Sequence, residues 1–212
     1  MKPDQVVTLY AALRAADPDP RSELEFSTPF ELLVAVILSA QATDRSVNVA
    51  TRVLFPLART PAAILALGVA GLTPLIRHIG LFNAKAKNVI ETCRLLLERH
   101  DGEVPRDRAA LEALPGVGRK TANVVLNVAF GEPTLAVDTH VFRVANRTGL
   151  APGKTPLAVE QKLLQVTPAA FLQHAHHWLI LHGRYVCLAR RPQCFACVIA
   201  GVCRFRPKTR AP

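Results

Sequence analysis

The stretch that decides the fold is Leu114-Pro-Gly-Val-Gly-Arg-Lys-Thr-Ala122. A short run of helical character, residues 107–113, precedes it, and a long and mostly apolar run, residues 121–130, follows it. Gly116 and Gly118 can adopt backbone angles that are closed to other residues, and they let another backbone approach closely. The first N–H groups of the second helix have no partner within that helix, so they form a site suited to phosphate. The sequence therefore predicts two helices joined by a hairpin, with a phosphate site at the bend.

Lys120 lies in the first turn of the second predicted helix, directly after Arg119. The positive end of the helix dipole and the neighbouring guanidinium both disfavour an ammonium at this position. A lysine whose amine is partly neutral is a nucleophile and can form a Schiff base. Lysines that only contact phosphate are far commoner than catalytic ones, so the spacing by itself favours a phosphate contact.

The prolines and glycines predict an all-α chain. Five of the sixteen prolines follow a threonine, and such a pair suits a helix start, because threonine caps a free N–H and proline fits the first helical position. Glycines that follow apolar-periodic runs predict helix ends. About ten helices result. The pairs are Thr28-Pro29, Thr60-Pro61, Thr73-Pro74, Thr155-Pro156 and Thr167-Pro168, and the glycines are Gly68, Gly80, Gly102, Gly131, Gly149 and Gly183.

The predicted helices before the hairpin cover most of the first hundred residues. One of them, residues 29–42, is apolar on almost all sides and is expected to be buried in a helix bundle. In the helix at 84–99, Ile90, Cys93 and Leu97 share one face, so Cys93 is expected to be a core residue. The other predicted ranges are 4–16, 44–54, 61–67 and 73–78.

The positive charge is concentrated at the C-terminal end. The net charge is +10, and no acidic residue follows Glu160, whereas eight basic residues do, which leaves +2 for residues 1–160. Such asymmetry favours a polyanionic partner, either nucleic acid or an anionic membrane surface. The basic residues are Lys162, Arg184, Arg190, Arg191, Arg204, Arg206, Lys208 and Arg210.

No targeting or membrane segment is apparent. The first residues carry no apolar signal segment, and the longest apolar run, residues 30–42, is too short to span a bilayer and contains Glu31. We therefore expect a cytoplasmic protein, in which cysteines are normally reduced or bound to metal.

Four cysteines near the C-terminus have the spacing Cys187-x6-Cys194-x2-Cys197-x5-Cys203. Four thiols within seventeen residues indicate a metal site. Zinc held by four cysteines usually shows two Cys-x2-Cys pairs, and only one is present here. An iron–sulfur cluster also takes four cysteines, although this spacing is neither of the common ferredoxin patterns. The spacing alone leaves both metals open.

Asp138 follows Gly131-Glu-Pro133 and opens a predicted helix at 139–145. An aspartate at that place is an ordinary N-cap residue. From position alone, this structural role is the simpler interpretation.

The hairpin sequence Leu-Pro-Gly-Val-Gly-Arg-Lys-Thr-Ala-Asn-Val-Val-Leu-Asn, the segment Val137-Asp138-Thr139-His140-Val141 and the four cysteines resemble signatures of the endonuclease III family of DNA glycosylases. The resemblance runs from about residue 31 to residue 203. It implies an all-α, helix–hairpin–helix DNA glycosylase fold, with two helical domains flanking a cleft and a C-terminal [4Fe-4S] loop. It assigns residues 22–134 to a helical barrel domain, with the helix–hairpin–helix at about 107–130, and residues 1–21 plus 135–212 to an iron–sulfur domain.

The same resemblance implies a base-excision-repair DNA glycosylase with abasic-site (β-elimination) lyase activity, which removes oxidised pyrimidines from double-stranded DNA. Lys120 would attack the sugar carbon that bears the base, and Asp138 would stabilise positive charge on the sugar and help to move the lysine proton. Cys187, Cys194, Cys197 and Cys203 would bind a [4Fe-4S] cluster, with zinc as the second choice. The expected partner is double-stranded DNA with a damaged base or abasic site, bound by a monomer in the cytoplasm, associated with the nucleoid and not with a membrane.

The DNA contacts are expected in three places. The hairpin residues Gly116, Val117, Gly118 and Arg119 would bind the DNA backbone, and Arg190 and Arg191 would bind phosphates from the cysteine loop. In the family, residues matching Gln41 and Leu81 fill the hole left by the flipped base and wedge the opposite strand. Without the family resemblance, Gln41 would be interpreted as an ordinary surface glutamine, and Leu81 as a leucine packed in a small hydrophobic cluster beside the main core.

Three rival functions remain. Adenine or mismatch glycosylases of the same family generally lack a lysine at the position of Lys120, and the adenine enzymes carry an extra C-terminal domain. A non-catalytic DNA-binding iron–sulfur protein would not nick abasic DNA, and an iron–sulfur electron carrier would not bind DNA tightly. A separate group, His174, His176 and His177, has no acidic or cysteine partner nearby, so packing is a better interpretation than metal binding.

Overall fold

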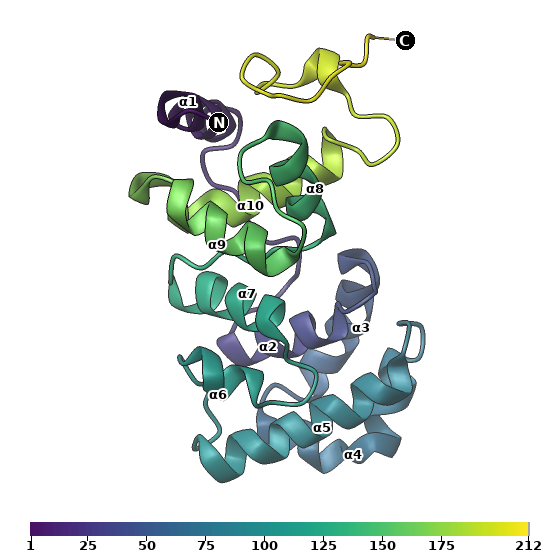
Figure 1. Ribbon diagram of the computed structural model, residues 1–212. Coiled ribbons are helices and arrows are strands. Elements are labelled where there is room, and N and C mark those ends of the chain that lie inside the picture. Colours follow the sequence, from purple (N-terminus) through teal and green to yellow (C-terminus); the bar gives the residue numbers. More distant parts are fainter. Residues whose placement is uncertain (212) are drawn as a thin grey trace. The chain divides into compact units, whose positions relative to one another are not determined.

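The computed structural model describes residues 1–211 and is all-helical there, as predicted, with no strand in that range (Figure 1). In chain order the helices are α1 (Pro3–Ala16), α2 (Pro29–Leu38), α3 (Asp44–Leu57), α4 (Pro61–Ile76), α5 (Phe82–Arg99), α6 (Arg108–Glu112), α7 (Arg119–Phe130), α8 (Thr139–Thr148), α9 (Pro156–Val166), α10 (Ala169–Tyr185) and the 3-10 turn η1 (Cys194–Ala196).

The chain forms two compact units. One, which we call the contiguous unit, is Ser22–Gly131; the other, the split unit, combines Met1–Arg21 with Glu132–Pro212. The assignment of these parts to a barrel domain and an iron–sulfur domain stays a prediction.

The contiguous unit is organised around α2. Phe30 to Leu38 are all buried, because the helix is apolar apart from Glu31 and α3, α5 and α7 each pack against it. α6 packs on α7, so the short helix before the hairpin and the long helix after it lie against each other. The hairpin is therefore held between two helices that pack against each other.

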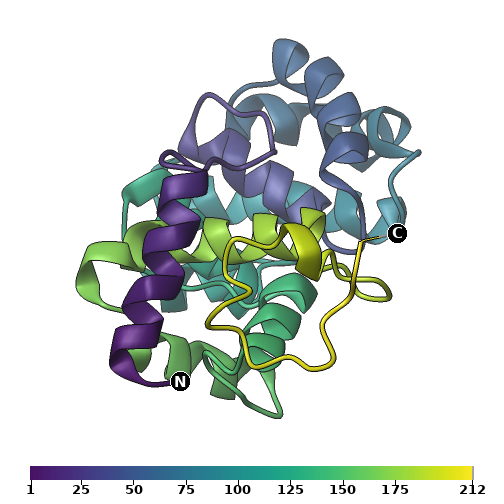
Figure 2. The ribbon, with the colours of Figure 1, turned by 90° about the horizontal axis from the view of Figure 1, so that it is seen from above.

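The split unit has its own core, to which both ends of the chain contribute. α1 packs against α10, and α10 against α8, as Figure 2 shows from above. The ring of Tyr10 stacks on Phe171 with centroids 5.5 Å apart, and Phe171 meets Trp178 edge-on at 6.1 Å. The Trp178 indole N–H donates to the Asp17 carbonyl at 2.8 Å, and the Tyr10 and Thr167 hydroxyls lie 2.9 Å apart.

Three of the threonine–proline pairs begin helices as predicted. The hydroxyl oxygens of Thr28, Thr60 and Thr155 each accept the N–H of the residue three positions on, at 3.1–3.2 Å, and the following proline occupies the first turn.

The sequence prediction is wrong at several helix boundaries. α2 ends at Leu38 and not at residue 42, because Gln41 has a φ of 54° that a helix cannot contain. The Thr73-Pro74 pair lies inside α4. Gly68, with a φ of 62°, interrupts α4 where a helix end was predicted. The helix continues directly after Gly68, however, and ends at Ile76, so no new helix begins at Thr73.

Gly183 was expected to end a helix, yet α10 continues to Tyr185. A Cβ at Gly183 would lie 2.8 Å from the Cβ of His140. This glycine therefore serves the close packing of α10 against α8 and not a helix end.

Cys93 is fully buried, as predicted, and burial raises its thiol pKa to about 12.

In the described part of the chain, no single helix has both the length and the apolar character needed to cross a membrane; only α3 and α4 taken together, bent by 115°, pass that test of length and composition.

Candidate active site and cysteine loop

The two hairpin glycines play different parts. Gly116 has a φ of 78°, and a Cβ there would lie 2.9 Å from Nδ2 of Asn88 and 3.3 Å from Cγ2 of Ile37. The fold therefore requires glycine at this position. Gly118 has a φ of −94° and a ψ of 176°, which any residue can adopt, and a Cβ there would meet nothing within 4 Å. The expectation of unusual backbone angles is confirmed at Gly116 and wrong at Gly118.

The hairpin presents a helix start to solvent. Leu114 and Val117 are buried and anchor the bend, and the Thr92 hydroxyl donates to the Pro115 carbonyl at 3.1 Å. Gly118 is the N-cap of α7 and has no side chain to bind the first N–H groups. Arg119 and Lys120 follow at the exposed first turn of this twelve-residue helix. The arrangement can bind an anion through backbone N–H groups and two cationic side chains.

Asp138 is the N-cap of α8, as predicted. Its Oδ1 accepts the N–H groups of His140 at 2.9 Å and Val141 at 2.8 Å. Both bonds go to the same carboxylate oxygen, so Oδ2 stays outside the cap. The carboxylate is half-buried and held in one orientation by the backbone. Lys120 belongs to the contiguous unit and Asp138 to the split unit.

Gln41 and Leu81 share an unusual backbone. They are two of three non-glycine residues with positive φ among residues 1–211, at 54° and 62°. A Cβ placed on Gly80 would lie 3.7 Å from the Gln41 carbonyl oxygen, so the two turns adjoin. Gln41 is exposed, and Leu81, the N-cap of α5, is 58% exposed. Such strain at bulky residues is a feature of functional sites, and the exposure of Leu81 excludes the interpretation of a core leucine.

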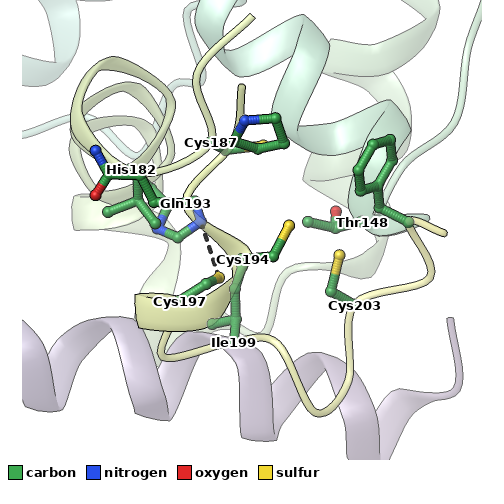
Figure 3. Close-up of a pocket in the computed structure, with 11 residues that line it drawn as sticks. Thr148, His182, Cys187, Gln193, Cys194, Cys197, Ile199 and Cys203 are labelled. Carbon is green, nitrogen blue, oxygen red and sulfur yellow. Dashed lines mark hydrogen bonds between the residues drawn. The ribbon is translucent and has the colours of Figure 1, made fainter. Parts of the chain in front are cut away.

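The four cysteines line one pocket in the split unit, with the thiols of Cys194 and Cys203 directed into it (Figure 3). The space between the lining side chains is about 290 Å³, including its open side, and its walls are largely apolar. All four cysteines are half-buried, and none forms a disulfide. No three potential metal ligands in the described range converge as they would around a single ion.

Burial dominates the electrostatics of this pocket. It raises the pKa of the Cys197 thiol, and the neighbouring thiols of Cys203, Cys187 and Cys194 raise that pKa further. Burial also lowers the pKa of His182 to about 4, so its ring is neutral near pH 7. The His182 Nε2 lies 3.5 Å from the Cys197 sulfur (Figure 3).

Arg190 and Arg191 are exposed on the loop between the first two cysteines. Arg191 lines a second and wider pocket together with Phe195 and Arg210. The basic character predicted for this loop therefore lies at its surface.

Sequence reasoning missed Arg143 and Arg147. Both lie on α8, one helical turn apart, and donate to backbone carbonyls and a sulfur of the segment that leads into the cysteine loop. Because Arg143 and Arg147 are four residues apart on the helix that Asp138 caps, the sequence could have indicated that both lie on one face of it.

Comparison with known proteins identifies the family. Residues 34–169 match the family described as HhH-GPD superfamily base excision DNA repair protein. Endonuclease III of Escherichia coli (strain K12) is 65% identical over 196 residues, which cover 92% of this chain and 93% of the relative. Endonuclease III of Haemophilus influenzae is 60% identical over 202 residues, which cover 95% and 96% of the two chains.

Two solved structures have the same fold. One is described as a trapped endonuclease III–DNA covalent intermediate, with a TM-score of 0.90, 45% identity and 96% of each chain covered. The other is described as a non-covalent endonuclease III–DNA complex, with a TM-score of 0.91, 44% identity and the same coverage. This all-helical chain therefore belongs to the endonuclease III family of base excision DNA repair proteins.

Proposed function

We propose that Lys120 and Asp138 perform the reaction of a bifunctional DNA glycosylase and abasic-site lyase that removes oxidised pyrimidines. The activity itself follows from the family, because the relatives are 60–65% identical over nearly the whole chain. The single observation that carries the residue assignment is the placement of Lys120, exposed on the first turn of α7 at the edge of the hairpin.

The hairpin is proposed to bind the DNA backbone. Phosphate would accept N–H groups of the first turn of α7, and the Arg119 and Lys120 side chains would add positive charge. Gly118 supports this role, since its open face lets a phosphate approach the backbone closely. The damaged nucleotide would then be extruded from the duplex toward Lys120.

In the chemical step, the Lys120 amine attacks the sugar carbon that bears the base. The bond from that carbon to the base breaks, and the base leaves with the electron pair. Loss of the amine proton and opening of the sugar ring give a Schiff base. Removal of a proton from the adjacent carbon then expels the 3′ phosphate, which nicks the strand. The trapped covalent complex of a relative with DNA supports a covalent route.

Asp138 is proposed to stabilise positive charge on the sugar and to help move the lysine proton. The cap bonds to Oδ1 hold its carboxylate in place, so Oδ2 is the oxygen that would serve the substrate. A preorganised carboxylate needs little rearrangement as charge develops.

The cysteine pocket is proposed to hold a [4Fe-4S] cluster. The fit is supported by four unpaired thiols around one apolar pocket, which is the donor set that such clusters use. When bound, the cluster would join four points of an otherwise irregular loop. Cys187, Cys194, Cys197 and Cys203 would hold it, and Arg190 and Arg191 would meet DNA phosphates from the loop surface. We expect a brown protein with iron and sulfide by assay; colourless zinc-loaded protein would contradict the cluster.

The decisive experiment is borohydride reduction during turnover of a duplex with an oxidised pyrimidine. Reduction of the Schiff base should trap the protein on DNA, and Lys120→Ala should abolish the adduct. Asp138→Asn should keep DNA binding and lower excision by about 10²–10⁴-fold. Lys154→Ala, an exposed lysine of the split unit, is the control. An adduct formed by Lys120→Ala would overturn the assignment, and a panel of lesions would define the substrate range.

Gln41 and Leu81 are proposed to fill the duplex when the base is extruded. Leu81→Ala should weaken binding to a damaged duplex and slow excision. Leu57→Ala is a matched control, since Leu57 is 63% exposed in the same unit. Equal binding by the Leu81 and Leu57 variants would refute the wedge.

We also propose that the protein acts as a monomer in association with nucleoid DNA. Light scattering with and without a damaged duplex should give one protein per duplex; two per lesion would contradict this stoichiometry.

A further inference from the structure

α8 is fastened to the cysteine loop by two arginine side chains. The Arg143 guanidinium donates to the carbonyls of Gly183 at 2.7 Å and Cys187 at 2.9 Å. That of Arg147 donates to the carbonyls of Leu188 at 2.6 Å and Ala189 at 2.5 Å. Arg147 also lies 3.7 Å from the Cys187 sulfur. Two adjacent turns of one helix thus hold the whole backbone segment that enters the loop.

The far side of the loop holds the same helix. The N–H of Arg204, directly after Cys203, donates to the Thr148 carbonyl at the end of α8 at 3.1 Å. The Arg147 guanidinium lies 5.1 Å from the centre of the Phe205 ring, a cation–π distance. The C-terminal half of α8 is therefore held by the chain on both sides of Cys187 and by the residues directly after Cys203.

The chemistry of these contacts is specific to arginine. A planar guanidinium presents several N–H donors in fixed directions, so one side chain can bind two successive carbonyls at once. A lysine ammonium can replace the charge but not this geometry. Hydrogen bonds with a charged donor are also about twice as strong as neutral ones.

The opposite end of α8 carries Asp138. The helix has ten residues, so it is about 15 Å long. A tilt of about 4° around its C-terminal end would move the Asp138 cap by roughly 1 Å. A misplacement of that size costs about a hundredfold in rate when a group must meet a reacting atom.

We propose that Arg143 and Arg147 are positioning residues through which the cysteine loop sets the orientation of Asp138. The cysteine loop then serves catalysis from the far end of a rigid helix, in addition to any contact with DNA. The proposal rests on the proposed function for Asp138, but its first test does not.

That test is amide hydrogen exchange of α8 in the purified holoenzyme. Arg143→Met and Arg147→Met keep most of the side-chain stem, and their double variant should accelerate exchange of the His140 and Val141 amides by about 10–100-fold. Arg147→Lys should restore only part of the protection. Lys154→Met, which removes a charge from the same unit, should leave α8 exchange unchanged. Unchanged exchange of α8 in the double variant would overturn the proposal.

Kinetics separate positioning from DNA contact. Loss of the arginine contacts should lower the excision kcat by about 10–100-fold and change KM by less than about threefold. A rise in KM with constant kcat would instead mean that the arginines bind DNA, which overturns the proposal. Asp138→Asn could excise at the normal rate while the arginine variants still accelerate exchange of α8. That result would refute the proposed role of Asp138 but keep the finding that the arginines hold α8 to the cysteine loop.

Iron removal gives an independent check. Chelation of iron from the wild-type protein should accelerate α8 exchange, and the same treatment of the double variant should add little, because the connection is already cut. An equal acceleration in both proteins would show that the loop acts on α8 without these arginines and would overturn the proposal. Trp178 fluorescence confirms that each variant keeps the fold of the split unit, since Trp178 is the one tryptophan of the sequence.

Discussion

The hairpin and the cysteine loop are both irregular segments next to proposed functional residues, but they are fixed in different ways. The hairpin takes its shape mainly from its own residues, namely the positive φ of Gly116, the buried Leu114 and Val117 and the helices on each side, with one added bond from Thr92. The cysteine loop has only the 3-10 turn at Cys194–Ala196, and α8 holds it by side chains. A locally fixed segment tolerates the loss of distant contacts, whereas a remotely fixed one does not.

The largest effect expected from this contrast follows the loss of a thiol. Cys197→Ser should abolish iron binding and lower the stability of the split unit by about 5 kcal/mol or more, because metal binding and folding of such a loop are coupled. Hydrogen exchange should show opening of the split unit while Ser22–Gly131 keeps its protection. Cys93→Ala is the control, since Cys93 lies in the core of the contiguous unit and should leave the iron content unchanged.

The next largest effect concerns pH: acid should lower the stability of the split unit more than that of the contiguous unit. His177 is buried, and burial, with a smaller contribution from His174, lowers its pKa from about 6.5 to about 4. The folded state thus favours the neutral ring. The stability that this gives is complete above pH 6.5 and is lost as pH falls from 6.5 to 4, by about 2–3 kcal/mol. Urea unfolding followed by Trp178 fluorescence measures it.

His177→Gln should remove only part of that pH dependence, because burial also lowers the pKa of His182 in the same unit to about 4. His78→Gln, at an exposed position of the contiguous unit, should leave it unchanged. A pH dependence of stability that is unchanged in His177→Gln would assign the whole effect to other groups.

The hairpin glycines offer a matched pair with a smaller effect. Gly116→Ala should lower stability by about 2 kcal/mol, or roughly 4–8 °C in Tm, because alanine is strained at its φ and its Cβ would press on Asn88. Gly118→Ala should change stability by less than about 0.5 kcal/mol and still weaken DNA binding. Calorimetry and binding titrations check both. Equal stability of the two variants would remove the distinction drawn between the glycines.

The smallest effect concerns the helix that enters the hairpin. Asp107 caps α6 through Oδ1, which accepts the Ala110 N–H at 2.8 Å. Asp107→Ala should cost about 1 kcal/mol, and Asp107→Asn should retain most of the cap. A similar loss for both variants would point to charge and not to capping.

The same contrast explains what the sequence could predict. Helix starts at Thr28, Thr60 and Thr155 depend on neighbours within three residues, so they were predicted correctly. The path of α4 through Pro74 was not, because the restart after Gly68 overrides the local start signal. Gly183 was misread for a related reason, since its partner His140 is far away in sequence.

Site prediction follows the same rule. Lys120, Asp138 and the cysteines stand in local patterns, and their positions in the fold agree with those patterns: the first turn of α7, the cap of α8 and one shared pocket. Their chemical roles stay predictions. Arg143 and Arg147 act through residues 40 or more positions away, so no window of sequence contains both the donors and their carbonyls.

The division of the split unit between the two ends of the chain has a consequence for synthesis on the ribosome. α1 emerges first, with Val6, Leu9, Tyr10 and Leu13 ready to be buried, but α10, which covers it, is completed only at Tyr185. At ordinary translation rates that interval lasts about 10–30 s. The contiguous unit is complete at Gly131 and can fold within it. A nascent chain would therefore expose one apolar helix beside an already folded neighbour, which is the kind of segment that chaperones bind.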